Sequence, residues 1–265
     1  RAGEPSASPV KRAAVEAGLD VYQPQRVRDP EFEQLLRELN PEVAVVVAYG
    51  KILPAGVLRV PRSGFVNVHF SLLPVYRGAA PVQRALIDGV DKTGVSLIVL
   101  TEGMDEGPIL ATCAAKVAED DTAGRLGARL ARLGAELLVP TLNAYAKGGI
   151  RPIEQDHARA TYAPKVTTEE ARIDWSRRGS EIRNLVRGCN PEPGAWTTFR
   201  GRRVKVLFVE PASGEPAMGE VDASGRVGTG EGALFLSEVQ MAGKRAMSGT
   251  EMLRGLRPAP GEHFE

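Results

Sequence analysis

The sequence of 265 residues is poor in cysteine and has no long hydrophobic run. Its two cysteines, Cys113 and Cys189, form no CxxC pair, so neither a disulfide framework nor a zinc site is indicated. No apolar run reaches the roughly 18 residues of a membrane-spanning helix, and the start lacks the charged and then apolar pattern of a signal peptide. We therefore expect a globular protein of the reducing cytoplasm that binds no metal.

A strong excess of charge of either sign is also missing. The chain has 34 Lys and Arg against 33 Asp and Glu, a net charge of +1, so no global basic field argues for a nucleic-acid partner. With 43% hydrophobic and 25% charged residues, the composition is that of an ordinary globular protein. The length allows one large domain or two smaller ones, and we expect two.

The first part of the chain alternates between helical and strand patterns. Residues 43–49 (VAVVVAY) form a continuous apolar run, which is typical of a central parallel strand covered on both faces. The alternation predicts an α/β class, a Rossmann-like domain with a largely parallel sheet. We expect helices at residues 9–18, 30–39, 81–87 and 122–138, and strands through Val21 and at 43–49, 64–70, 95–100 and 109–117.

The texture of the sequence changes after Gly149, where the chain becomes polar and weakly periodic and contains two prolines. This pattern predicts an exposed linker at residues 155–168, between a catalytic domain at 1–154 and a second domain at 169–265. The second domain reads as a small OB-like β-barrel with Gly-containing turns. We expect a helix at residues 180–188 and strands at 195–199, 204–209, 219–221 and 234–239.

Polar residues alternate along the strand predicted at 64–70. Asn67, His69 and Ser71 project to one face, and buried polar groups of this kind need partners or a ligand. In open α/β sheets ligands bind at the carboxyl ends of strands. Asp105 lies in a Gly-containing loop that also follows an apolar strand, so we expect it at the same edge of the sheet. A lone His is more often structural and a lone Asp in such a loop is often a turn residue, but together they indicate a catalytic site.

The segment NVHFSLLPVYRGAAPVQ at 67–83, with Gly-Met-Asp-Glu-Gly at 103–107, resembles the signature of folate-dependent formyltransferases. That signature has Asn-x-His followed by Ser-Leu-Leu-Pro and Arg-Gly, with a catalytic Asp in a later Gly-x-Asp-x-Gly loop. The wider chain is similar to the members that act on methionyl-tRNA, and the similarity covers both domains. It is carried by VVVAYGKILP at 45–54, EEARIDW at 169–175, NPEPGAW at 190–196 and QMAGKRAM at 240–247.

The resemblance implies transfer of a formyl group from 10-formyltetrahydrofolate to the amino group of methionine on initiator tRNA, for translation initiation. Asn67 and His69 would supply donors to the oxyanion, and Asp105 would receive the amine proton or set the charge of His69. Folate binding is carried over to six positions. These are Tyr49, Gly50, Ser71, Leu72, Leu73 and Pro74.

The family has a strand, a helix, a second strand and a basic loop ahead of the first segment matched here. We therefore expect the natural protein to have residues before Arg1, and a chain truly starting there to be unstable, because a parallel sheet would lack two strands.

A local basic excess lies in the second domain. Residues 172–205 contain nine Lys and Arg and three Asp and Glu, which indicates contact with tRNA phosphates. We expect a monomer whose tRNA contacts come from this run. The candidates are Arg177, Arg178, Arg202, Arg203 and Lys205.

Two classes of alternative remain open from the sequence. A sugar-nucleotide or glycinamide ribonucleotide formyltransferase, or a formyltetrahydrofolate hydrolase, would share Asn67, His69 and Asp105. A non-catalytic RNA-binding protein on a decayed scaffold is the other alternative, although the intact Asn, His and Asp argue against decay.

Overall fold

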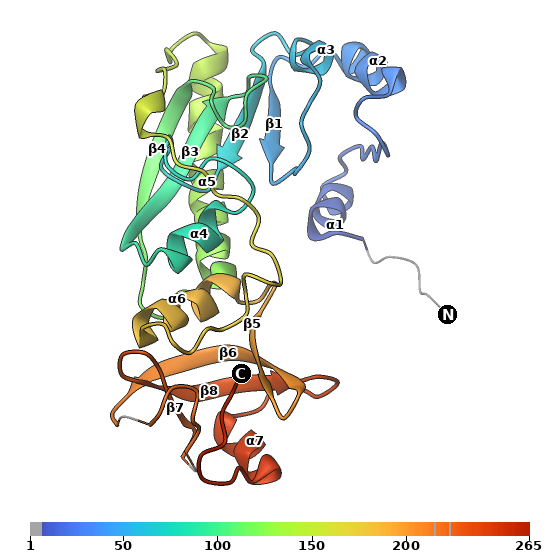
Figure 1. Ribbon diagram of the computed structural model, residues 1–265. Helices are drawn as coiled ribbons and strands as arrows, with labels where there is room; N and C mark the ends of the chain where they lie inside the picture. The colour runs from blue at the N-terminus through green and yellow to red at the C-terminus, as the bar shows by residue number, and fades with distance from the viewer. Residues whose placement is uncertain (1–6, 215, 223) are drawn as a thin grey trace.

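A computed structural model describes residues 7–265 of the chain except 215 and 223. It has two sheets, one in each half of the chain, with helix α6 between them (Figure 1). None of the helices in the described ranges has both the length and the hydropathy needed to span a membrane. The elements are α1 (Pro9–Glu16), α2 (Pro30–Leu39), β1 (Ala44–Val47), α3 (Ala55–Leu58), β2 (Phe65–His69), α4 (Pro81–Ile87), β3 (Lys92–Val99), β4 (Ile109–Lys116), α5 (Ala123–Ala146), η1 (His157–Arg159), α6 (Gly179–Cys189), β5 (Ala195–Phe199), β6 (Arg202–Ala212), β7 (Arg226–Gly228), β8 (Ala233–Met241) and α7 (Gly249–Leu256).

The first sheet has the strand order β1-β2-β3-β4. The α/β class is confirmed, but the sheet is mixed rather than largely parallel, because only β1 and β2 pair in parallel and the other two pairings are antiparallel. The loop that joins β3 to β4 is too short for the crossover that a parallel pairing needs. Because β2 and β3 run in opposite directions, their carboxyl ends lie at opposite ends of the strand pair.

Two strand predictions at the front of the chain differ from the structure. Strand β1 pairs with β2 alone among the described residues, and Val45 and Val47 are 41% and 50% exposed, so it is not covered on both faces. Its apolar run predicts burial, but the burial alternates along the strand. Val21 lies outside any strand, because it has no ladder partner in the described ranges.

The first core lies between this sheet and α5. Thr122 caps the helix by accepting a hydrogen bond from the Arg125 backbone N–H, as its position predicts. The helix continues past Pro140 to Ala146, eight residues beyond the predicted end at 138. Proline removes one intrahelical hydrogen bond, but Thr141, the next residue, is buried and keeps the helix packed.

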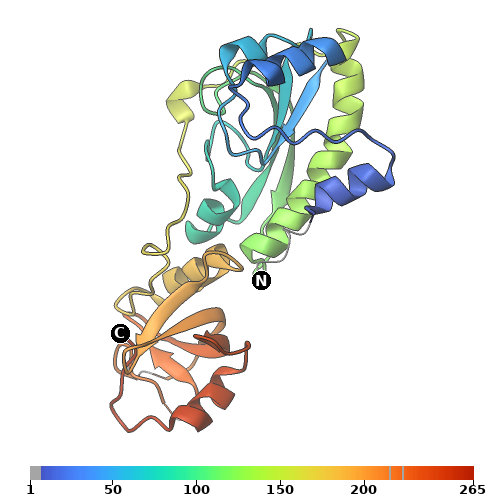
Figure 2. The same cartoon turned by 90° about the vertical axis from the view of Figure 1, so that its right-hand side faces the viewer.

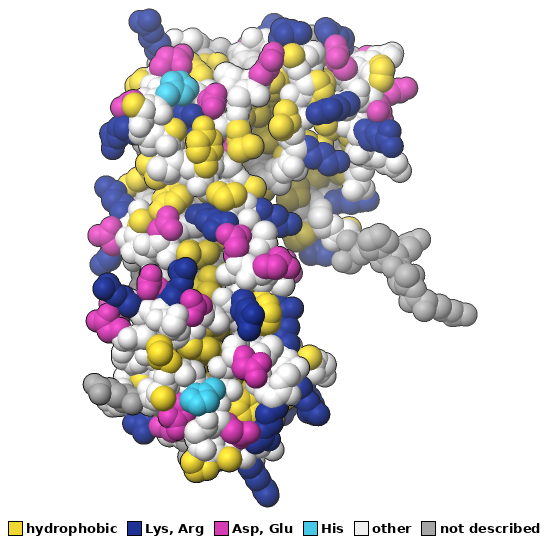
Figure 3. All heavy atoms as spheres, in the orientation of Figure 1, with side chains coloured by type: hydrophobic (Ala, Val, Ile, Leu, Met, Phe, Trp, Pro, Cys, Tyr) yellow, Lys and Arg dark blue, Asp and Glu magenta, His cyan; other side chains and the backbone are white. Residues whose placement is uncertain are grey.

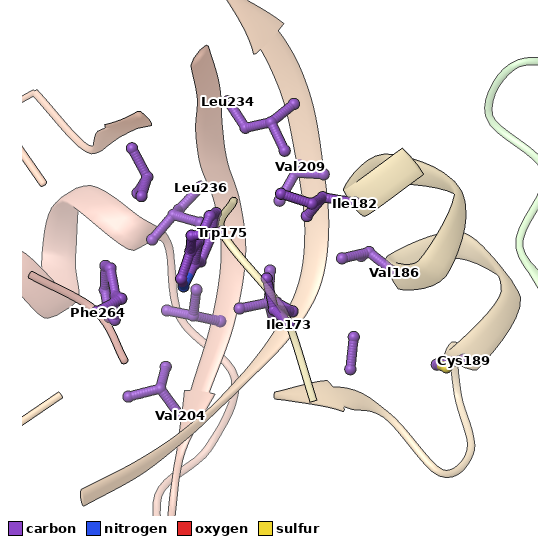
Figure 4. Close-up of a cluster of buried hydrophobic side chains, with 14 of the residues drawn as sticks. Ile173, Trp175, Ile182, Val186, Cys189, Val204, Val209, Leu234, Leu236 and Phe264 are labelled. Carbon is purple, nitrogen blue, oxygen red and sulfur yellow. The ribbon is translucent and has the colours of Figure 1, made fainter. Parts of the chain in front are cut away.

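The second sheet is antiparallel, with the order β5-β6-β8-β7, and it curls into a half-barrel. Its core is filled by side chains from α6 and the inner faces of β6 and β8 (Figure 4). Glu220 and Val221 form isolated bridges where a strand was predicted at 219–221, and β7 and α7 were not predicted. Gly-rich turns and short apolar runs in this region carry too little periodicity to separate these elements.

The two halves meet where α4 packs on α6. A Cβ at Gly188 would lie 2.6 Å from Ile87 Cγ1 and 2.9 Å from the Gln83 carbonyl oxygen, so glycine permits this close approach. Arg187 donates to the carbonyls of Asp121 and Ala118 across the same junction. These contacts hold the second half against the first.

Most residues of the predicted linker at 155–168 are exposed, as expected, but parts of the segment lie against the first half. In Figure 2 the chain after α5 runs down the outside of the molecule from η1 to the second sheet. Gln155, Ala163 and Val166 are nevertheless buried. The polar composition of this segment predicts that its side chains are solvated, but Gln155 and Thr161 form hydrogen bonds to residues of the first half. We call residues 153–163 the strap; the domain bounds 1–154, 155–168 and 169–265 stay a prediction.

Candidate active site

A cavity of about 380 Å³ opens beside β1 and β2. In Figure 3 hydrophobic side chains line a shaded hollow over β1, with Lys and Arg side chains on its rim. This volume is within the range of small-molecule sites, and a mostly apolar wall with a few polar groups is their usual character. Its lining residues are Val46, Ala48, Tyr49, Gly50, Lys51, Ile52, Leu53, Leu58, Asn67, Val68, His69, Phe70, Gly78, Ala79, Pro81, Leu100, Thr101, Glu102, Gly103, Met104 and Asp105.

Strand β2 supplies two of the predicted catalytic side chains. Asn67 and His69 both line the cavity, as the alternation of side chains along a strand predicts. Val66 is fully buried on the opposite face, in the first core. The burial of that face fixes the register of the strand, and with it the side on which Asn67 and His69 lie.

The imidazole of His69 is held in one orientation. Its Nε2 lies 2.8 Å from the carbonyl oxygen of Tyr76, which can only accept, so Nε2 carries the hydrogen. Burial lowers the pKa of His69 below its ordinary value of 6.5, although the charge of Asp105 and the Tyr76 carbonyl act in the opposite direction. At neutral pH the ring is therefore neutral, with an unprotonated Nδ1.

Asp105 lies against both β2 side chains. Its Oδ1 accepts a hydrogen bond of 3.2 Å from Asn67 Nδ2, and its Oδ2 accepts one of 2.9 Å from the Gly78 backbone N–H. The same Oδ2 lies 3.5 Å from His69 Nδ1. The structure thus brings together Asn67, His69 and Asp105, the three predicted catalytic residues.

Asp105 does not reach Asn67 and His69 by the route expected from the sequence. Because β2 and β3 are antiparallel, the loop after β3 begins at the edge of the sheet where β2 starts, not where it ends. Residues 101–108 instead fold back over β2, and Asp105 takes a left-handed backbone conformation with φ 53°. Such a conformation costs about 1 kcal/mol or more for a non-glycine residue and needs support from its surroundings.

Gly107 closes the same loop against β3, and its replacement by Ala is expected to destabilise the protein. A Cβ at this position would lie 1.7 Å from the backbone oxygen of Val99, which cannot rotate away. We expect Gly107→Ala to lower the free energy of unfolding by roughly 3 kcal/mol or more. Chemical denaturation measures this. Gly127→Ala, where a Cβ meets open space on helix α5, is the control that should not destabilise.

The predicted folate residues fall into two groups. Tyr49 and Gly50 line the cavity, and their part in folate binding stays a prediction. The run 71–74 is not part of its lining: Ser71 is fully buried and donates to the Val75 carbonyl, and the Leu73 backbone N–H donates to Ser96 Oγ. This run supports the loop after β2, and any direct part in folate binding stays a prediction.

Sequence reasoning missed two sets of residues around the site. The apolar walls of the cavity include Leu58 and Leu100, which carry no motif that distinguishes them from core residues. The strap also contributes: Gln155 bonds to the backbone of the Asp105 loop, and Thr161 Oγ1 accepts from the Tyr76 backbone N–H. Their polar side chains read as solvated linker residues.

The five predicted tRNA contacts are divided by the structure. Side chains alternate along β6, so Arg203 and Lys205 share its outer face while Arg202 lies on the other side. Arg203 and Lys205 line a small pocket of about 220 Å³ with the turn at 240–243. Beside them, the Arg203 guanidinium lies 4.0 Å from the ring centre of Trp196.

Two of the five are instead paired at the surface. Arg177 lies 3.9 Å from Asp174, and Arg178 lies 3.0 Å from Glu231. All four side chains are more than half exposed, so these pairs stabilise little. The acidic partners nevertheless reduce the positive potential that Arg177 and Arg178 would present to a phosphate.

Among the described residues, no group of three or more His, Cys, Asp or Glu side chains is arranged to hold a metal ion. Cys189 is buried, and burial raises the pKa of its thiol to about 11.

Comparison with known proteins gives the same assignment in both halves of the chain. A family model described as formyl transferase matches residues 1–142, and one described as the formyl transferase C-terminal domain matches residues 165–257. The methionyl-tRNA formyltransferase of Streptomyces coelicolor is 45% identical over 97% of this chain and 84% of its own length. That of Thermobifida fusca is 44% identical over 97% of this chain and 85% of its own.

A solved structure shares the fold. HypX from Aquifex aeolicus, in complex with tetrahydrofolic acid, superposes with a TM-score of 0.68 at 19% identity, over 85% of this chain and 41% of that one. At this identity the likeness concerns the fold alone. The two family models and the identity to the full-length relatives show that the chain belongs to the formyl transferase family, and within it to the methionyl-tRNA formyltransferases.

Proposed function

We propose that this chain transfers the formyl group of 10-formyltetrahydrofolate to the amino group of methionine on initiator tRNA. The observation that carries the proposal is the convergence of Asn67, His69 and Asp105 on one wall of the cavity. The reaction forms a bond between the amine nitrogen and the formyl carbon, and breaks the bond from that carbon to N10. The folate supplies the formyl group, and N10 leaves with a proton.

Asn67 is the proposed donor to the negative charge that develops on the formyl oxygen. Its side-chain amide has two hydrogens, and one of them is given to Asp105. The other is available on the cavity side, where Asn67 lines the wall. A donor that is held in place before the reaction stabilises this charge without reorganisation.

We propose that His69, assisted by Asp105, accepts the amine proton. The Nε2–H of His69 is used by the Tyr76 carbonyl, so this nitrogen is not the oxyanion donor expected from the sequence. Neutral Nδ1 can take a proton, and Asp105 at 3.5 Å stabilises the imidazolium that forms. This pair therefore acts in proton transfer, and Asn67 in charge stabilisation.

The apolar part of the cavity suits the folate ring system. Tyr49, Ile52, Leu53 and Leu100 offer flat or aliphatic surfaces, and the backbone of the 101–105 loop supplies polar groups beside them. We propose that the ring lies between these two walls. The formyl group would then reach Asn67 and His69.

One assay tests the proposed function. Protein is incubated with 10-formyltetrahydrofolate and charged initiator tRNA, and formylmethionine is measured after hydrolysis of the ester. A sugar-nucleotide amine, glycinamide ribonucleotide and buffer alone serve as competing acceptors. Formylmethionine as the main product is expected; preferential formylation of another amine, or release of formate, would show that one of the alternatives is right.

The outer face of β6 is the proposed contact for tRNA phosphates. We expect Lys205→Gln and Arg203→Gln each to reduce the slope of log affinity against log salt concentration by roughly 0.7 to 0.9 unit. Each substitution removes one phosphate contact, so fewer counterions are released when tRNA binds. Arg178→Gln, whose charge is partly neutralised by Glu231, should change the slope less. Filter binding of tRNA across a salt series measures all three, and equal slopes in every variant would remove this surface from the interface.

We propose that this protein works in the cytoplasm, because its acceptor would be charged tRNA. We also expect a monomer, which light scattering would establish.

A further inference from the structure

Arg77 is among the largest fully buried side chains of the protein, with 1% exposure, yet it carries a charge. It does not line the cavity. A buried guanidinium needs hydrogen-bond partners on most of its N–H groups. They come from the strap and the catalytic loop: Gln155 Oε1 accepts from Nε and Nη2 at 3.1 and 2.7 Å, His157 Nδ1 lies 3.2 Å from Nη2, and Glu106 Oε1 lies 3.5 Å from Nη1.

Gln155 connects this arginine to the loop that carries Asp105. Since a guanidinium can only donate, the oxygen of the Gln155 amide must face Arg77, and its nitrogen must face the other way. That nitrogen donates to the backbone carbonyls of Asp105 and Gly107, at 2.8 and 2.7 Å. Every donor and acceptor of the buried amide is therefore used, and its orientation is fixed.

The carbonyls of Asp105 and Gly107 belong to the part of the loop whose backbone conformation places the Asp105 carboxylate. Asp105 has φ 53°, an unfavourable conformation for a residue with a side chain. The position of its carboxylate decides the 3.2 Å contact with Asn67 and the 3.5 Å contact with His69. A bond to the backbone oxygen of the same residue restrains the rotation that would move that carboxylate.

We propose that Gln155 is a positioning residue: oriented by Arg77, it holds Asp105 at the distance from His69 and Asn67 that proton transfer requires. The proposal rests on the proposed function and adds a residue from the strap to the catalytic machinery. Gln155 lies 50 residues after Asp105 in sequence. The connection to the second half of the chain thus takes part in building the site in the first.

Two substitutions of Gln155 test the proposal. Gln155→Glu keeps the shape and an acceptor for Arg77 but removes both donors to the loop. Gln155→Met removes all hydrogen bonds at similar volume. Each is expected to lower kcat by about tenfold or more, because displacement of a catalytic group by a fraction of an ångström is costly, while KM for the folate changes by less than about twofold because Gln155 does not line the cavity. Glu154→Gln, at the exposed neighbouring position, is the matched control and should behave as wild type.

A double-mutant cycle separates positioning from simple stabilisation. If Gln155 acts through the Asp105 carboxylate, Gln155→Glu should change kcat by less than about twofold in a protein that already carries Asp105→Asn. The proposal would be overturned if Gln155→Glu lowered kcat by the same factor in the wild-type and the Asp105→Asn protein. An unchanged kcat in folded Gln155→Glu would also overturn it. Thermal unfolding identifies a variant that has not folded, and if Gln155→Met fails to fold, Gln155→Glu decides.

A second readout is independent of turnover. The His69 ring resonances, measured by NMR without substrate, should shift in Gln155→Glu as Asp105 moves away from Nδ1, and should not shift in Glu154→Gln. Unshifted resonances would contradict the positioning role. Absence of formyl transfer by the wild-type protein would instead contradict the proposed function, so the two failures are distinct.

Discussion

Replacing Asn67 or His69 by Ala is expected to slow formyl transfer by about a hundredfold or more. Removal of one preorganised oxyanion donor typically costs about 3 kcal/mol of transition-state stabilisation, and loss of a general base has an effect of similar size. Both side chains line the cavity, and His69 is held by the Tyr76 carbonyl on its other nitrogen. Single-turnover rates with saturating folate and charged tRNA measure the effect.

The controls for these substitutions separate chemistry from folding. Both variants should bind the folate with near-normal affinity and unfold near the wild-type temperature, because the apolar walls and the Val66 face of β2 are unchanged. Asn143→Ala and His263→Ala, at exposed positions outside the cavity, should be fully active. Near wild-type turnover in folded Asn67→Ala or His69→Ala would mean that the residue concerned has no part in the chemistry.

Residues with a strong local pattern could be predicted from the sequence. Asn67 and His69 alternate with Val66 and Val68, and a period of two on a buried strand determines which side chains share a face. Helices with clear start signals were also predicted closely: α2 and α4 both begin at a proline and have the predicted bounds.

Features that depend on distant contacts could not be predicted. Asp105 was expected beside His69 because both follow strands, yet it arrives through a loop that folds back across an antiparallel pair. Gln155 lies in a polar stretch of sequence that is typical of a solvated linker. Its role depends on Arg77, a buried arginine 78 residues earlier in the sequence. Sheet direction and burial are set by tertiary packing, which local periodicity does not encode.

Asp105→Asn should slow transfer by about a hundredfold and move the acidic limb of the pH–rate profile to lower pH. Asn fits the site well, because it is similar in shape to Asp and tolerates the left-handed conformation that residue 105 adopts. It cannot, however, supply the negative charge beside His69 Nδ1. The substitution therefore removes the charge while leaving the loop in place.

The direction of the pH effect follows from the groups that act on His69. The base must be neutral to accept the amine proton, so activity is lost as the pH falls through the pKa of His69. Burial already lowers that pKa below 6.5, and the charge of Asp105 acts against this effect. In Asp105→Asn burial acts with less opposition, so the pKa falls further and the limb moves to lower pH. Glu102→Gln, a carboxylate on the same loop that also lines the cavity, is the matched control and should leave the limb in place. Profiles of kcat from pH 4 to pH 9 test this; a limb that stays fixed or moves to higher pH in Asp105→Asn would show that His69 is not the base that Asp105 assists.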